Sequence, residues 1–224
     1  ESWGSFVDVR LNAPEVLRHE VKRKKAGRVF ISSVCDGWQP AEANYLVTRR
    51  CLEILLLHHY PLSILTKSAL AGRDLDILAS KPEVEFGVTI TTLDESLRRL
   101  IEPKSSSPTG RLALLQEAKR RGIKTYAFLG PFLPFLSDTE ESLTSLLRAI
   151  KDVGVDYFYV DRLNQRFGVW LSLRNLLQEH FPHLIDSYRK ILFDRTASRQ
   201  YSEGLASSVS CLARKLGLDG KMIL

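Results

Sequence analysis

The 224-residue chain has 44% hydrophobic and 26% charged residues, a balance that excludes collagen-like and low-complexity proteins. Its formal net charge is +6, and its basic clusters suit either phosphate contacts or the solvated outer faces of helices. No run of about 18 apolar residues occurs, so we expect no membrane partner. Three widely spaced cysteines argue against a disulfide framework and favour a cytoplasmic location.

Short hydrophobic runs alternate along the chain with longer segments of helical periodicity. A short strand and a helix are expected over residues 6–12 and 13–24. Further strands are predicted at residues 28–34, 61–68, 84–92, 123–131 and 155–164, and helices at 41–59, 110–122 and 141–154. Because parallel strands need crossover connections, this alternation predicts an α/β fold whose sheet is covered on both faces or closed into a barrel.

The ends of several elements are marked by residues with special backbone preferences. Gly27, Gly122 and Gly154 each close a helical stretch just before a predicted strand, as C-cap glycines do. Asp138, three residues before Glu141, resembles the start of a capping box. No linker interrupts the chain. We therefore expect a single domain over residues 1–224, with a barrel at about 1–169 and a helical C-terminal extension at 170–224.

Each predicted strand changes from apolar to polar or special residues at its C-terminal end. In parallel sheets and barrels this edge binds ligands, although a single polar strand end is commonly just the cap of the next helix. Five such ends together favour one ligand site. The residues concerned are Ser33, Cys35 and Asp36; Thr66, Lys67 and Ser68; Thr89, Thr91 and Thr92; Gly130 and Pro131; and Asp161, Arg162 and Asn164.

Several of these side chains carry more than one interpretation. Lys67, flanked by apolar residues, could bind a carboxylate or phosphate, act as a Schiff-base nucleophile, or simply reach solvent. Asp161 and Asn164 could bind a ribose hydroxyl or an amine, or cap a turn. Trp38 could belong to the core or stack on a base. No histidine or cysteine spacing matches a metal site within this chain.

The motifs "WGSFVDVRLNAPEVL", "ISSVCDGWQPAEANYLVTRRCLEIL", "VTITTLDESLRRLIEPKSSSPTGRL", "FLGPFLP" and "YVDRLN" occur in one order between Trp3 and about Tyr188. This series resembles the radical S-adenosylmethionine (SAM) proteins of the spore photoproduct lyase-like, or DNA repair photolyase-like, group. The resemblance implies a partial (β/α)6 TIM-like barrel that holds SAM and a [4Fe–4S] cluster. It implies an enzyme that generates a 5′-deoxyadenosyl radical for hydrogen abstraction, with an external electron donor and a nucleic-acid or nucleotide substrate, in DNA repair or modification.

The resemblance also assigns cofactor-binding residues at the strand ends. They are Ser33 and Asp36 near the methionine amino group, Lys67 and Thr89 near the carboxylate or ribose, and Thr91, Asp161 and Asn164 elsewhere on the rim. Spore photoproduct lyases use a cysteine in the first of these segments as a hydrogen-atom donor. Aligning the aspartate on Asp36 puts Ser33 at that position, so Cys35 is either a catalytic thiol or a neutral thiol on the rim.

The sequence departs from this family in its cysteines. The cluster of such enzymes is bound by a Cys-x-x-x-Cys-x-x-Cys loop, and Cys35, Cys51 and Cys211 do not have that spacing. We expect the first strand and the cluster ligands upstream of Glu1, and this chain alone to be inactive. Two alternatives stay open: a degenerate barrel that acts as a nucleic-acid-binding or scaffolding module, and a Schiff-base or phosphate-binding barrel enzyme built around Lys67.

Overall fold

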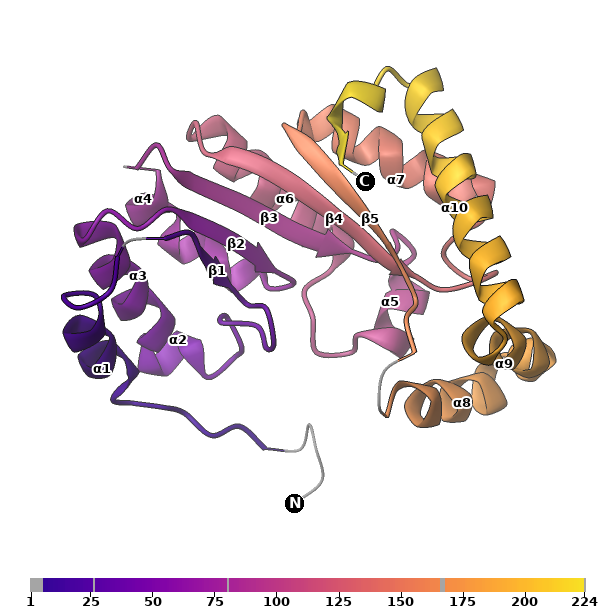
Figure 1. The fold of residues 1–224 in the computed structure, drawn as a ribbon, viewed down its shortest axis with the longest axis horizontal. Coiled ribbons are helices and arrows are strands. Elements are labelled where there is room, and N and C mark those ends of the chain that lie inside the picture. Colours follow the sequence, from indigo (N-terminus) through magenta and orange to yellow (C-terminus); the bar gives the residue numbers. More distant parts are fainter. Residues whose placement is uncertain (1–5, 26, 80, 166–167, 224) are drawn as a thin grey trace. The chain divides into compact units, whose positions relative to one another are not determined.

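The structure is a computed structural model that describes residues 6–25, 27–79, 81–165 and 168–223 (Figure 1). Its strands are β1 (Val29–Ile31), β2 (Leu62–Thr66), β3 (Val84–Ile90), β4 (Lys124–Phe132), β5 (Tyr157–Arg162) and β6 (Met222–Ile223), and they follow chain order in a six-stranded sheet. The pairs β1–β2, β2–β3 and β5–β6 are parallel. The predicted α/β class is therefore confirmed, with strands close to the five longer predicted runs.

Helices connect these strands and form the C-terminal region. They are α1 (Ala13–Glu20), α2 (Glu42–Tyr45), α3 (Val47–Leu57), α4 (Leu75–Leu78), α5 (Glu95–Ile101), α6 (Pro108–Arg120), α7 (Glu140–Val153), α8 (Val169–His180), α9 (Ile185–Phe193) and α10 (Arg195–Lys215). Short 3-10 turns, η1 (Ala69–Asp74), η2 (Pro182–Leu184) and η3 (Asp219–Lys221), complete the set. No helix within the described residues is long and apolar enough to cross a bilayer.

The contacts within the chain group into two compact units. Unit 1 comprises Glu1–Thr89, Gly110–Tyr126 and Val153–Asp156, and unit 2 comprises Ile90–Thr109, Ala127–Asp152 and Tyr157–Leu224. The predicted organisation as one domain, with a barrel and an extension divided near residue 169, stays a prediction.

The core of unit 1 lies around β2 and β3. Leu62 and Ile64 of β2 and Phe86 and Val88 of β3 are buried, and so are most residues that alternate with them. Burial of successive residues shows that both faces of these strands are covered, as the uniformly hydrophobic sequence predicts. Helix α1 packs on α3 in the same unit (Figure 1).

The core of unit 2 joins its helices to the ends of β4 and β5. Leu133 and Leu163, which directly follow β4 and β5, pack with Leu177 of α8 and with Tyr188 and Leu192 of α9. Helix α10 contacts α9, and the chain then returns through η3 to pair β6 with β5 (Figure 1). The C-terminal region is thus helical, as predicted, except for the two-residue strand β6.

Several local expectations are wrong. Residues 6–12 form no strand, and Leu46, with φ 54°, divides the predicted helix at 41–59 into α2 and α3. Gly122 and Gly154 adopt positive φ after α6 and α7, as C-cap glycines do, but α1 ends at Glu20, too early for Gly27 to cap it. Trp3 lies outside the described residues.

Asp138 does not cap α7. The Thr139 hydroxyl accepts from the Ser142 backbone N–H at 3.2 Å, so Thr139 takes the capping position. The Asp138 carboxylate instead accepts from the Phe135 backbone N–H at 2.6 Å and the Tyr201 hydroxyl at 2.8 Å. Asp138, which the local sequence predicts to cap α7, is therefore bound instead to Tyr201 of α10.

Candidate functional site

In unit 1 the loop after β1 is joined to the end of β2 through Asp36. The Thr66 hydroxyl lies 2.8 and 2.9 Å from the two carboxylate oxygens of Asp36, and the backbone N–H of Lys67 donates to one of them at 2.8 Å. The Trp38 backbone N–H donates to the other at 2.9 Å. The structure thus brings together two predicted site residues, Asp36 and Lys67, at neighbouring strand ends. Asp36 fixes the backbone at the half-buried Lys67.

The tip of this loop faces solvent. Ser32 takes a positive φ of 74°, its hydroxyl accepts from the Gly37 backbone N–H at 3.0 Å, and the chain between them turns outward. Ser33 and Cys35 are exposed, and Val34 between them is 94% exposed. Two further predicted residues therefore lie on the same loop as Asp36 but are exposed to solvent, unlike its hydrogen-bonded base. An exposed thiol at this position is available to a ligand or an oxidant.

Beneath the loop lies a buried network of charges that the sequence reasoning did not find. Trp38 is 1% exposed, and its indole N–H donates to Asp74 at 2.8 Å, which makes it a core residue rather than a base-stacking platform. Arg49 and Arg73 donate to the same carboxylate at 2.9 and 2.8 Å. Burial opposes ionisation of Asp74, but the hydrogen bonds from Arg73, Trp38 and Arg49 outweigh it and lower the pKa of that carboxyl.

A second carboxylate, Glu42 on α2, extends this network. It accepts from Arg73 at 3.0 Å and from the backbone N–H groups of Thr48 and Arg49 at 3.0 and 3.1 Å. The Thr48 hydroxyl in turn donates to the carbonyl of Gly37 at 2.6 Å. The loop after β1 is therefore held from below as well as from the β2 side. No periodicity in the sequence marks such long-range pairs, which explains why they were missed.

At the end of β3, structural hydrogen bonds involve the Thr89 backbone and the Thr91 side chain. In unit 1 the buried Arg111 donates to the Thr89 carbonyl at 2.7 Å. In unit 2 the Thr91 hydroxyl lies 3.0 Å from the Gly130 carbonyl and 3.3 Å from a Glu102 carboxylate oxygen. Gly130 has φ +127°, and a Cβ there would lie 2.4 Å from the Asp161 carbonyl. Glycine is therefore required where β4 passes the end of β5.

The turn after β5 brings together Asp161 and Asn164, as the sequence predicts. The Asp161 carboxylate accepts from the Arg162 backbone N–H at 2.9 Å and from the Asn164 amide at 3.2 Å. The same amide lies 3.0 Å from the Arg162 carbonyl. These contacts are those of a side-chain-capped turn, the plainer of the two interpretations left open. Arg166, which follows, lies outside the described residues.

The residues present fit the two expected cofactors differently. A half-buried lysine after a buried strand suits the carboxylate of SAM, and Asp36 holds the backbone that carries it. A cluster does not fit. The described residues contain no group of three or more histidine, cysteine or acidic residues able to hold a metal, and burial raises the pKa of the Cys51 thiol, with Glu42 adding to the effect.

We compared the chain with protein family models, solved structures and sequence relatives. No protein family model matches the chain. Among solved structures, a spore photoproduct lyase variant with bound AdoMet and dinucleoside spore photoproduct superposes with a TM-score of 0.55 at 17% identity, covering 78% of this chain and 52% of that one. Another variant of the lyase gives a TM-score of 0.64 at 15% identity over 95% and 66%. Streptococcus suis SuiB gives 0.53 at 14% over 82% and 42%.

These similarities establish the fold, and the sequence relatives establish the family. The uncharacterized protein Rv2578c of Mycobacterium tuberculosis is 32% identical over an alignment of 210 positions that covers 85% of this chain and 62% of that protein. ORF301 of Acidianus two-tailed virus is 30% identical over 98% of this chain and 69% of its own length. The uncharacterized protein MJ0683 of Methanocaldococcus jannaschii is 30% identical over 207 residues, 92% of this chain and 74% of the relative. The chain therefore belongs to the family of MJ0683, on the fold of spore photoproduct lyase.

Proposed function

We propose that this chain is the SAM-binding part of a radical SAM enzyme that acts on a nucleic acid or nucleotide. One observation carries the proposal: the fold of a lyase solved with bound AdoMet recurs here, and two parallel strand ends converge on the linked Asp36, Thr66 and Lys67. Ligands of parallel α/β folds bind at this edge. This chain spans only 52% of the lyase and 62% of Rv2578c. The activity of the whole protein is therefore part of the proposal.

Each residue has a distinct part in this proposal. The Lys67 ammonium pairs with the carboxylate of SAM, and Asp36 positions it through the Lys67 backbone. Asp36 itself already accepts from three donors, which leaves little of its capacity for the amino group of SAM. Ser33, Thr89, Thr91, Asp161 and Asn164 stay proposed contacts to the cofactor, and the exposed Cys35 stays a proposed catalytic thiol.

Radical SAM chemistry requires a [4Fe–4S] cluster in addition to SAM. A [4Fe–4S] cluster held elsewhere in the whole protein would supply the electron for reductive cleavage of SAM, the source of a hydrogen-abstracting radical that the resemblance implies. Because the described residues offer no ligand set for the cluster, we propose that it depends on cysteines other than Cys35, Cys51 and Cys211. An external electron donor belongs to the same proposal, and this chain alone is proposed to be inactive. The dinucleoside bound to the lyase supports a nucleotide substrate.

The test is SAM binding by the protein as its gene encodes it, measured by isothermal titration under anaerobic conditions. Lys67→Ala is expected to weaken binding by about tenfold or more, because a hydrogen bond between charged groups is lost. Lys22→Ala removes an exposed lysine of unit 1 and is the matched control, with no change expected. Equal affinity for both variants would remove Lys67 from the site, and no SAM binding by the parent would overturn the proposed function.

A further inference from the structure

A cavity of about 650 Å³ lies in unit 2 between the end of β5 and the first turns of α10. Its volume is within the range of small-ligand pockets, roughly 300–1,000 Å³. The residues that line it come from the β5 turn, from the end of α9 and from α10. Those that carry charge or an aromatic ring are Arg162, Phe193, Asp194, Arg195, Arg199 and Glu203.

The charges around the cavity do not cancel. Arg199 and Glu203 pair with each other at 2.7 Å on the exposed side of α10. The Asp194 carboxylate caps α10 by accepting from the Ala197 backbone N–H at 2.8 Å. No carboxylate within the described residues forms an ion pair with Arg162 or Arg195. The three arginines and two carboxylates that line the cavity leave it a net charge of +1, with Arg162 and Arg195 outside any ion pair.

Arg162 is held in place before any ligand arrives. Its guanidinium donates to the Ser198 hydroxyl at 2.8 Å, so one of its five N–H groups is used for orientation. The remaining donors form a planar fork that matches the oxygens of a phosphate. Arg195, exposed on the first turn of α10, supplies a second cation to the same cavity.

An aromatic ring lies beside these cations. Phe193 lines the cavity, yet it is 49% exposed, and its ring meets Trp170 edge-on at a centroid distance of 5.6 Å and an angle of 84°. The contact with Trp170 orients the ring. An exposed, oriented ring beside unpaired arginines is the arrangement with which proteins stack nucleobases and hold the adjoining phosphates.

We propose that this cavity binds a single strand of nucleic acid, with a backbone phosphate at Arg162 and Arg195 and a base on Phe193. The inference deepens the proposed function, since it rests on that function for the nucleic-acid substrate and adds the surface that holds it. Neither SAM nor a cluster takes part in this contact. Binding to the cavity can therefore be measured separately from SAM binding.

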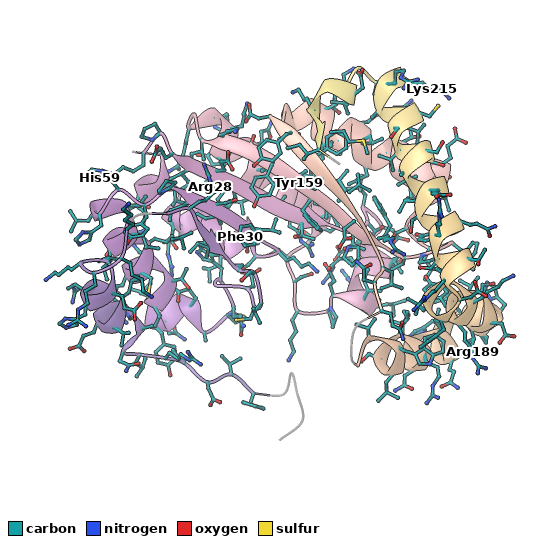
Figure 2. The ribbon with its side chains drawn as sticks, in the orientation of Figure 1. Arg28, Phe30, His59, Tyr159, Arg189 and Lys215 are labelled. Atoms are coloured by element: carbon teal, nitrogen blue, oxygen red, sulfur yellow. The ribbon has the colours of Figure 1, made fainter. Side chains whose placement is uncertain are left out.

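The experiment measures the fluorescence anisotropy of a labelled single-stranded DNA oligonucleotide, with the protein as its gene encodes it. Arg195→Ala is expected to weaken binding about fivefold and to reduce the salt slope by about one between roughly 50 and 200 mM salt. Lys215→Ala, at the opposite end of α10 from α9 (Figure 2), is the matched control and should change neither. Arg162→Gln should act like Arg195→Ala.

The aromatic contact is tested with a second probe, an abasic strand of the same length. Phe193→Ala is expected to weaken binding of the base-bearing strand severalfold and to leave the abasic strand unaffected. Circular dichroism of each variant checks that α10 is intact. Equal losses for Arg195→Ala and Lys215→Ala, or no binding by the parent at low salt, would overturn the inference.

The two proposals fail separately. If the parent binds SAM but the oligonucleotide responds to none of these variants, the cavity is not the nucleic-acid site and the proposed function stands. If the oligonucleotide responds as expected but SAM does not bind, the proposed function fails and the chain is a nucleic-acid-binding module.

Discussion

The loop after β1 and the turn after β5 both follow parallel strands, but they are held by different forces. The first is fixed by carboxylates: the half-buried Asp36 joins it to Thr66 and Lys67, and Trp38 anchors it on the buried Asp74. The second is fixed by the side-chain amide of Asn164, which bonds to its own turn. Unpairing a buried carboxylate costs far more than opening a half-exposed turn.

This difference suits two different tasks. A loop held by several hydrogen bonds keeps the Lys67 backbone at one place, which suits the proposed recognition of a small carboxylate. A turn with weaker restraints, beside a cavity lined by arginine and serine, can adjust to a larger and more varied ligand. Four substitutions follow, beginning with the largest expected effect: those of Asp74, Asp36 and Asn164 test this contrast, and that of Tyr201 tests a contact outside both segments.

Asp74→Ala is expected to lower the free energy of unfolding by about 3 kcal/mol, because the buried Trp38 indole N–H loses its acceptor and Arg49 and Arg73 each lose one of their carboxylates. Urea denaturation measures the loss. The control is Asp76→Ala, which removes a carboxylate that also pairs with Arg49 but is 54% exposed, and which should cost less than about 1 kcal/mol. Equal costs for the two would mean that the buried network does not hold the loop.

Asp36→Ala is expected to cost about 2 kcal/mol, since the Thr66 hydroxyl and two backbone N–H groups lose their acceptor. It should also weaken SAM binding, because the Lys67 backbone is released. Asp36→Asn keeps an acceptor and is expected to recover part of both losses. A variant that loses stability but binds SAM as tightly as the parent would show that Asp36 does not position Lys67.

Tyr201→Phe is expected to cost about 1 kcal/mol at neutral pH, allowing for the partial exposure of Asp138. Burial raises the pKa of Asp138 above its ordinary value of 3.8, and the Tyr201 hydroxyl limits that rise. The stability contributed by Asp138 is therefore complete below pH 3.8 and is lost as the pH rises through the folded pKa. The variant raises that pKa further, so its deficit should shrink toward low pH. A deficit independent of pH would contradict this account.

Asn164→Ala is expected to have the smallest effect, about 0.5–1 kcal/mol, because the side chain is half-buried and water can replace its bonds to Asp161 and Arg162. Chemical denaturation beside Asp36→Ala measures the difference between the two strand ends. If Asn164→Ala cost as much as Asp36→Ala, the turn after β5 would be held as firmly as the loop after β1, and the contrast between them would fail.

The sequence predicts well the features that depend on local pattern. Strands β2 to β5 follow from their hydrophobic runs, the ends of α6 and α7 follow from Gly122 and Gly154, and the turn of Asp161 with Asn164 follows from the spacing of "DRLN". In each case the signal lies in the pattern of neighbouring residues. That is why period and turn chemistry are sufficient there.

Features that depend on distant residues were missed. Trp38 and Asp74 lie 36 residues apart, and Asp138 and Tyr201 lie 63 apart. The two-residue strand β6 exists through its pairing with β5, and the cavity arises from packing α10 against the β5 turn. Such contacts leave no periodicity in the sequence. The sequence therefore indicates which residues lie at the strand ends, whose role as a ligand site stays a prediction, but it does not indicate the distant residues that support them.

The central proposal, that this chain is part of a radical SAM enzyme, is tested most directly by iron and sulfide quantitation. The protein as its gene encodes it would be reconstituted anaerobically beside this 224-residue chain. The account predicts about four irons per protein in the former and none in the latter. No cluster in either preparation would contradict it and would leave a barrel-like module that binds nucleic acid.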